Sequence, residues 1–116
     1  MSNVNIQELV QISLIIQAVH AGRIVMDELC IYAEEDIGGI SESLACYLDR
    51  YPKIANDTEV YSDFVRANNL ELLYYGQQFK DVVDNVYGQK PSATLGDVVA
   101  ALNCYIEHDD FRDFNE

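Results

Sequence analysis

The chain has 116 residues, enough for one domain with its own hydrophobic core, so we expect a single acidic globular domain over residues 1–116. Hydrophobic residues make up 49% and charged residues 23%, proportions that exclude a disordered chain. Twenty acids against seven bases give a net charge of −13. A field of that sign repels phosphate backbones and anionic membranes, so we expect neither direct nucleic-acid binding nor membrane binding.

The compartment is predicted from the start of the chain and from the cysteines. The first residues lack the basic segment of a secretory signal, and the most apolar stretch, residues 12–19, is too short to span a bilayer. Cys30, Cys46 and Cys104 are widely spaced and odd in number, a pattern typical of free thiols in a reducing compartment. These features predict a cytoplasmic protein.

The first half of the chain predicts two helices and a strand. Apolar residues at helical spacing predict a helix over residues 5–21, with Gly22 as its C-terminal stop. The apolar run 29–33 lies between acids and predicts a buried strand, with a helical continuation as the alternative. A second helix is expected over residues 41–51 and ends at Pro52, because the residue before proline resists the helical region.

The next segment predicts a helix followed by a strand. Asp57 or Thr58 is the expected N-cap of a helix that buries Val65 and stops at the left-handed pair 68–69. Residues 70–75 are rich in large apolar and aromatic side chains, which favours a strand.

The last part of the chain predicts two more helices. Helical spacing over residues 77–87 ends at Gly88, and Thr94 and Asp97 stand near the spacing of a capping box at the start of the final helix. The order helix, strand, helix, helix, strand, helix, helix predicts an α-rich α+β fold. We expect about five helices around a small sheet of two or three strands.

No group of residues points to catalysis, a metal or a cofactor. The chain has no glycine-rich phosphate loop, and its only histidines are His20 and His108. His20 is expected at a helix end, where the helix dipole favours a cation. Adjacent residues such as His108 and Glu107 point in different directions from a helix, so they do not converge on one ion. We therefore predict no catalytic residues, no metal ligands and no cofactor, and a protein that is not an enzyme.

The candidate binding residues are acids in two clusters and one pair of tyrosines. The first cluster flanks the first predicted strand and comprises Asp27, Glu28, Glu34, Glu35 and Asp36. The second cluster lies in the C-terminal tail and comprises Glu107, Asp109, Asp110 and Asp113. In the pair Tyr74–Tyr75, neighbours on a strand face opposite sides, so one ring should point outward as an interface anchor unless both faces are covered.

Residues 60–111 resemble a family of small uncharacterised bacterial proteins. The resemblance rests on Val60-Tyr61-Ser62-Asp63-Phe64-Val65, Asn69-Leu70-Glu71-Leu72, Phe79-Lys80-Asp81-Val82-Val83-Asp84-Asn85-Val86, Gln89-Lys90-Pro91-Ser92-Ala93-Thr94 and Cys104-Tyr105-Ile106-Glu107-His108-Asp109-Asp110-Phe111. That family includes immunity proteins of contact-dependent growth inhibition and related polymorphic toxin systems. The resemblance implies a partner-binding role and no catalytic residues.

Charge and resemblance together predict an immunity protein that neutralises a cognate basic toxin, most readily a nuclease domain, in a one-to-one complex. A nuclease holds phosphates in a positive groove, which an acidic protein can occupy. One alternative is a nucleic-acid mimic that inhibits a defence or regulatory protein, of the anti-CRISPR or anti-restriction type. Another alternative is a small homo-oligomeric scaffold that uses the apolar first helix as its interface.

Overall fold

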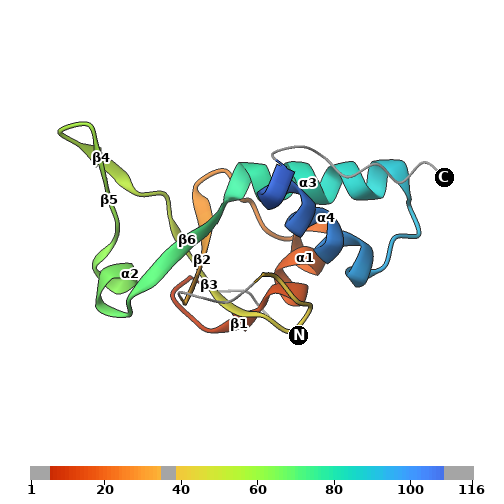
Figure 1. Ribbon diagram of the computed structural model, residues 1–116, viewed down its shortest axis with the longest axis horizontal. Helices are drawn as coiled ribbons and strands as arrows, with labels where there is room; N and C mark the ends of the chain where they lie inside the picture. The colour runs from red at the N-terminus through yellow and green to blue at the C-terminus, as the bar shows by residue number, and fades with distance from the viewer. Residues whose placement is uncertain (1–5, 35–38, 109–116) are drawn as a thin grey trace.

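The computed structural model describes residues 6–34 and 39–108 of the chain (Figure 1). Within these ranges the helices and strands follow one another as β1 (Val10–Gln11), α1 (Ile12–His20), β2 (Leu29–Glu34), β3 (Ala45–Arg50), β4 (Lys53–Ala55), β5 (Thr58–Val60), α2 (Asp63–Ala67), β6 (Leu70–Tyr75), α3 (Gly76–Gln89) and α4 (Leu95–His108). The expectation of about five helices around two or three strands is wrong. The described residues form four helices, a four-stranded sheet and a separate two-stranded hairpin.

The main sheet has the strand order β1-β3-β2-β6, and all three strand pairs are antiparallel. Cys30 on β2 lies opposite Asp49 on β3 and opposite Tyr75 on β6. Residues directly opposite one another on neighbouring strands point to the same face of a sheet. This register therefore lines up a carboxylate, a thiol and a phenol across one face, at the level where β3 ends and β2 begins.

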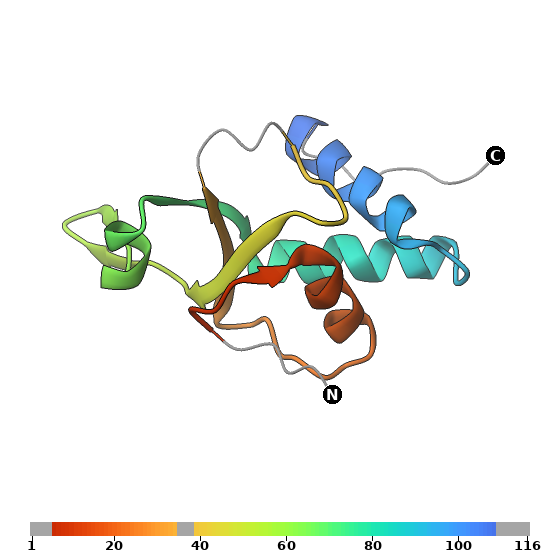
Figure 2. The same ribbon diagram turned by 90° about the horizontal axis from the view of Figure 1, so that it is seen from below.

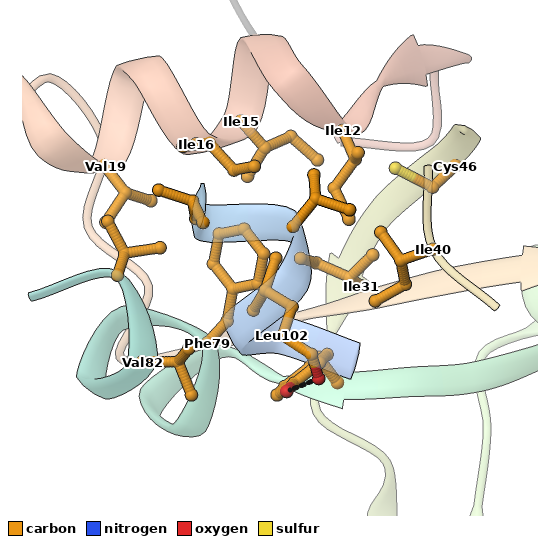
Figure 3. Close-up of a cluster of buried hydrophobic side chains, with 14 of the residues drawn as sticks. Ile12, Ile15, Ile16, Val19, Ile31, Ile40, Cys46, Phe79, Val82 and Leu102 are labelled. Carbon is orange, nitrogen blue, oxygen red and sulfur yellow. Dashed lines mark hydrogen bonds between the residues drawn. The ribbon is translucent and has the colours of Figure 1, made fainter. Parts of the chain in front are cut away.

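The other face of the sheet carries the main hydrophobic core. Helices α1, α3 and α4 gather on this face, as Figures 1 and 2 show, and Figure 3 shows their side chains converging with those of β2 and β3. Ile12, Ile15, Ile16, Ile31, Leu48, Phe79 and Leu102 have no more than 1% of their surface exposed. The apolar area that these side chains remove from water is the main favourable term for folding, at about 25 cal/mol per Å².

A smaller cluster covers the opposite face of the sheet. Cys30 and Tyr32 of β2 are buried there with Val65 of α2, and partly buried tyrosines and leucines pack around them. The β4–β5 hairpin extends away from this side of the molecule, and every residue of its two strands is exposed (Figure 1). An isolated two-stranded hairpin is marginally stable in water, so contacts at its base must hold it in place.

Several sequence expectations are confirmed. The predicted strands at residues 29–33 and 70–75 are β2 and β6, and the two predicted C-terminal helices are α3 and α4. Gly22 does stop α1, with φ of +71° and its N–H bonded to the Val19 carbonyl at 3.1 Å. The capping box forms as expected, because the Thr94 N–H donates to Asp97 and the Asp97 N–H donates to Thr94 Oγ1.

The predicted helix over residues 41–51 is wrong, because this segment contains β3. Cys46 and Leu48 face the helix-covered core, and the residues between and after them, Tyr47 and Asp49, face the other side. This alternation has the two-residue period of a strand. Pairing with β1 and β2 on either side satisfies the backbone of the segment, so tertiary pairing overrides its helical spacing.

The helix predicted to begin at Asp57 or Thr58 is also wrong at its start. Asn56 and Asp57 both have positive φ, 53° and 62°, and form the tight turn of the β4–β5 hairpin. Helix α2 begins later, at Asp63, where Ser62 is the N-cap and accepts a hydrogen bond from the Val65 N–H.

The sequence predicts the first helix over residues 5–21, but α1 runs from Ile12 to His20 and so begins seven residues later than predicted. Val10 and Gln11 pair with β3 instead, and Ile6 forms an isolated bridge with Leu48. The residues before α1 therefore extend the edge of the sheet, where Gln7 lies beside the end of β3.

Candidate functional site

Two adjoining hollows lie where β3 ends and β2 begins, with volumes of about 660 Å³ and 470 Å³. Both are lined by Ile6, Arg50 and Tyr51, so they adjoin one another, and we call the two together the mixed-charge groove. Its first part is also lined by Val25, Asp27, Glu28 and Leu29. Its second part is also lined by Gln7, Asp49, Lys53, Val60, Tyr61, Ser62, Asp63 and Arg66.

Asp49 is a buried residue that lines the second part of the groove and hydrogen-bonds to residues around it. Its side chain is 2% exposed, the lowest value for any charged residue described, and it accepts four hydrogen bonds. The donors are Gln7 Nε2 at 3.2 and 3.4 Å, the Arg50 N–H at 2.8 Å and Ser62 Oγ at 2.6 Å. A buried carboxylate is stable only when its lone pairs are satisfied in this way. Asp49 thus joins the N-terminal segment, β3 and α2.

Tyr51 forms the wall shared by both parts of the groove and is held from two sides. Its ring stacks on Tyr75 with centroids 5.6 Å apart, and its hydroxyl accepts a hydrogen bond from the Gln77 N–H at 3.1 Å. An aromatic side chain fixed in this way can contact a ligand with little further loss of conformational entropy.

Glu59, on β5, fastens the base of the hairpin to the sheet. Tyr61 Oη donates to one carboxylate oxygen at 3.0 Å, and Tyr75 Oη donates to the other at 2.7 Å. The bond to Glu59, with partial burial and the negative charge of that carboxylate, raises the pKa of Tyr75 from 10.0 to about 12. Both phenols therefore stay protonated at neutral pH and hold the hairpin beside the groove.

An acidic patch adjoins the first part of the groove and comprises Asp27, Glu28, Asp81 and Asp84. All four side chains are exposed. Three of them act on Lys80, whose pKa is raised by its hydrogen bond to Asp84 and by the charges of Asp84, Asp81 and Asp27. Four carboxylates against one ammonium leave this patch with a formal charge of −3.

The acidic patch depends on a close approach between α3 and the turn before β2. A Cβ atom at Gly76, the first residue of α3, would overlap the carbonyl oxygens of Leu29 and Met26. Only glycine allows the helix to begin so close to this turn. The contact brings Asp27, from the turn, within electrostatic reach of the exposed face of α3.

The structure separates the residues of the first predicted acidic cluster. Asp27 and Glu28 line the groove, but Glu34 is at the other end of β2, roughly 17 Å further along at about 3.3 Å per residue. Glu35 and Asp36 lie outside the described residues. Among the described acids of this cluster, Asp27 and Glu28 therefore do not share a surface with Glu34.

The two tyrosines have different environments, and neither ring is simply exposed. Tyr74 is 3% exposed in the helix-covered core and donates to the Leu102 carbonyl at 2.7 Å, so it is not accessible to a partner. Tyr75 faces the opposite side, half-buried between Tyr51 and Glu59. One ring is expected to point outward unless both faces of the strand are covered. Both faces of β6 are covered, so neither ring points freely into solvent.

Of the second predicted acidic cluster only Glu107 is among the described residues, and it does not line the groove. Glu107 is exposed in the last turn of α4, 3.7 Å from His108 Nε2. Asp109, Asp110 and Asp113 lie outside the described residues.

Sequence reasoning missed the basic side chains of the groove and the acids on α3. Arg50, Lys53 and Arg66 belong to three different elements or connections, so only the fold brings them together. Asp81 and Asp84 do carry a sequence signal, because residues three apart on a helix share one face.

The described parts of the chain contain no cluster of three His, Cys, Asp or Glu side chains arranged to hold a metal ion. Across residues 6–34 and 39–108, no helix combines the length and apolar character needed to cross a bilayer.

Residues 9–114 match the family described as "Domain of unknown function (DUF7716)". The chain belongs to the DUF7716 family. No curated protein and no solved structure matches it. The DUF7716 match includes the turn before β2, the end of β3, the hairpin and α3, and so includes every element that builds the groove except the segment at Ile6 and Gln7.

Proposed function

We propose that this DUF7716 chain is an immunity protein that binds a cognate basic toxin domain through the acidic patch and neutralises it. The observation that carries this proposal is the gathering of Asp27, Glu28, Asp81 and Asp84 beside the mixed-charge groove. A concentrated negative field steers a basic partner toward one face and raises the rate of encounter. The partner class we favour is a nuclease domain, since its phosphate-binding groove is positive.

The ion pairs of the chain support a surface kept available for a partner. Asp63, Asp84 and Asp97 pair with Arg66, Lys80 and Lys90, whereas Asp27, Glu28 and Asp81 have no salt bridge to any described residue. Unpaired carboxylates that share one patch repel one another, which costs stability in the free protein. Basic side chains of a partner would relieve that repulsion, so the free energy is recovered in the complex.

Residues 60–111 resemble a family of small uncharacterised bacterial proteins that includes immunity proteins, and this resemblance supports the same partner class. The stretch that carries it includes α3 with Asp81 and Asp84, and also Tyr61, Ser62 and Asp63 of the groove. In this proposal the protein is non-catalytic, acts in the cytoplasm and forms a one-to-one complex.

The proposal is tested with the product of the gene immediately upstream, expressed with and without this chain. We expect that product to stop growth when expressed alone and to co-purify with the chain in a one-to-one complex by light scattering. Growth should be restored by the wild-type chain and lost again with the triple variant Asp27→Lys, Glu28→Lys, Asp81→Lys.

A matched control separates the acidic patch from net charge. The triple variant Glu34→Lys, Glu71→Lys, Glu107→Lys makes the same change in charge at exposed positions outside the patch and the groove. We expect it to protect cells as the wild type does. Equal loss of protection in both triple variants, or no complex with the wild-type chain, would contradict the proposal.

A further inference from the structure

The mixed-charge groove contains an unusual share of the positive charge of this acidic protein. The whole chain has seven lysines and arginines, and three of them, Arg50, Lys53 and Arg66, line the second part of the groove. Attraction of a uniformly basic partner does not require them, and their charge opposes it. Their position therefore calls for a separate explanation.

Two of these basic side chains are available to a ligand. Arg66 pairs with Asp63, but Arg50 and Lys53 are exposed and form no salt bridge with any residue that the structure describes. Arg50 shares the first hollow with Asp27 and Glu28 and still makes no ion pair with either of them. Charges of both signs are thus presented side by side without neutralising each other.

Apolar and aromatic side chains line the groove together with its charged residues. Val25 and Ile6 are 72% and 40% exposed, unusually open for large aliphatic residues, and Tyr51, which stacks on Tyr75, lines the same hollow. Exposed apolar surface rimmed by charges is typical of a site that a partner covers.

We infer that the groove seats an extended segment of the partner protein that carries both a basic and an acidic side chain. The basic side chain meets Asp27 and Glu28, the acidic side chain meets Arg50 and Lys53, and an apolar residue between them packs on Tyr51, Ile6 and Val25. This inference rests on the proposed function and deepens it. The acidic patch speeds encounter, and the pair of opposite charges in the groove fixes the register and excludes partners that are only basic.

Attraction by net charge and specific recognition in the groove predict opposite changes in affinity for one double variant. The double variant Arg50→Glu, Lys53→Glu makes the chain more negative, so attraction by net charge alone would strengthen its binding to a basic partner. If the groove accepts an acidic side chain, the same variant places like charges together and must weaken binding. The control variant Arg23→Glu, Lys90→Glu makes the same charge change at exposed positions outside the groove.

The probe is the purified product of the upstream gene, with Kd measured by isothermal titration at 150 mM salt. We expect the groove variant to bind at least tenfold more weakly than wild type and the control variant to bind as tightly or more tightly. The neutral variant Arg50→Met, Lys53→Met should give an intermediate loss, and thermal unfolding establishes that each variant is folded. Replacing one acidic residue of the partner with lysine should restore binding to the groove variant.

The outcomes distinguish this inference from the proposed function. Wild-type binding that is lost in the Asp27→Lys, Glu28→Lys variant but unchanged or strengthened in the folded Arg50→Glu, Lys53→Glu variant overturns the inference and leaves the proposed function in place. Absence of wild-type binding overturns both.

Discussion

Ser62 Oγ donates a 2.6 Å hydrogen bond to Asp49 Oδ2 and accepts one from the Val65 N–H at 3.2 Å. The N-cap of α2 is therefore bonded directly to a buried carboxylate on β3. The same carboxylate accepts from Gln7 and from the Arg50 N–H, so one side chain fixes three walls of the mixed-charge groove. These hydrogen bonds join the N-terminal segment, β3 and α2 at the point where Arg50 and Arg66 line the groove.

Removing the Asp49 carboxylate should destabilise the fold. Asp49→Ala leaves the donors of Gln7, Ser62 and Arg50 without their shared acceptor, and we expect a loss of about 2–3 kcal/mol in the free energy of unfolding. Urea denaturation followed by circular dichroism measures it. The exposed control Asp81→Asn should stay within about 0.5 kcal/mol of wild type, and an equal effect of both variants would contradict the role of Asp49.

Gly76 and Gly88 lie in the same helix and should respond to alanine in opposite directions. Gly76→Ala forces a Cβ into the Leu29 and Met26 carbonyls, which should cost about 3 kcal/mol or more and weaken binding of the upstream product. Gly88→Ala meets nothing within 4 Å and should stabilise α3 by up to about 1 kcal/mol. Thermal and urea unfolding of both variants decide the point; a harmless Gly76→Ala would show that the close approach is not required.

Stability should fall at alkaline pH because burial raises the pKa of two thiols and of the Tyr32 and Tyr74 phenols. Burial raises the pKa of Cys30 from 9.0 to about 11 and that of Cys46 from 9.0 to about 12. A group whose pKa is raised on folding stabilises the fold fully below its unfolded pKa and loses that contribution as pH rises toward the folded pKa. We therefore expect the free energy of unfolding to fall between about pH 9 and pH 11.

The size of this alkaline loss is measurable. By pH 10.5 each thiol should cost on the order of 2 kcal/mol relative to pH 8, because one pKa unit corresponds to about 1.4 kcal/mol. Urea midpoints at pH 8, 9 and 10.5 give the slope, and Cys46→Ala should reduce it. A slope that is the same in wild type and Cys46→Ala would contradict burial as its cause.

The carboxylate of Glu59 should control the titration of Tyr75. Glu59→Gln removes the charge that accepts the Tyr75 hydrogen bond, so the pKa of Tyr75 should fall from about 12 toward 10.0. Carbon-13 NMR of the labelled tyrosine Cζ atoms resolves this one ring from the other tyrosines. Asp57→Asn, in the hairpin turn, is the control and should leave the Tyr75 pKa in place.

The elements that were predicted correctly carry their own local signals. The helix α4 has a capping box at Thr94 and Asp97 and a buried stripe, and β6 is a short run of large apolar residues before a glycine. Strand β3 lacks such a signal. Its residues share both a helical and an alternating pattern, and its pairing with β1 and β2 depends on segments distant in the chain. The spacing of its apolar residues alone could not decide between a helix and a strand.

The candidate site was predictable only in part for the same reason. Asp27 and Glu28 follow from acidic clustering in the sequence, but their separation from Glu34 depends on β2 being a full strand. No periodic pattern in the sequence marks Arg50 and Lys53 as a binding pair. They line one groove because β3 ends there and the hairpin begins, which is a property of the topology.

The central claim, that the acidic patch binds a basic partner, is tested most directly by one set of dissociation constants. The upstream gene product is titrated with the wild-type chain, with Asp27→Lys, Glu28→Lys, Asp81→Lys and with Glu34→Lys, Glu71→Lys, Glu107→Lys, each at 50 and 300 mM salt. We predict that the patch variant loses at least tenfold in affinity and most of its salt dependence, while the distant variant stays within threefold of wild type. Equal affinities for both variants, or an affinity of the wild type that does not change with salt, would contradict the claim.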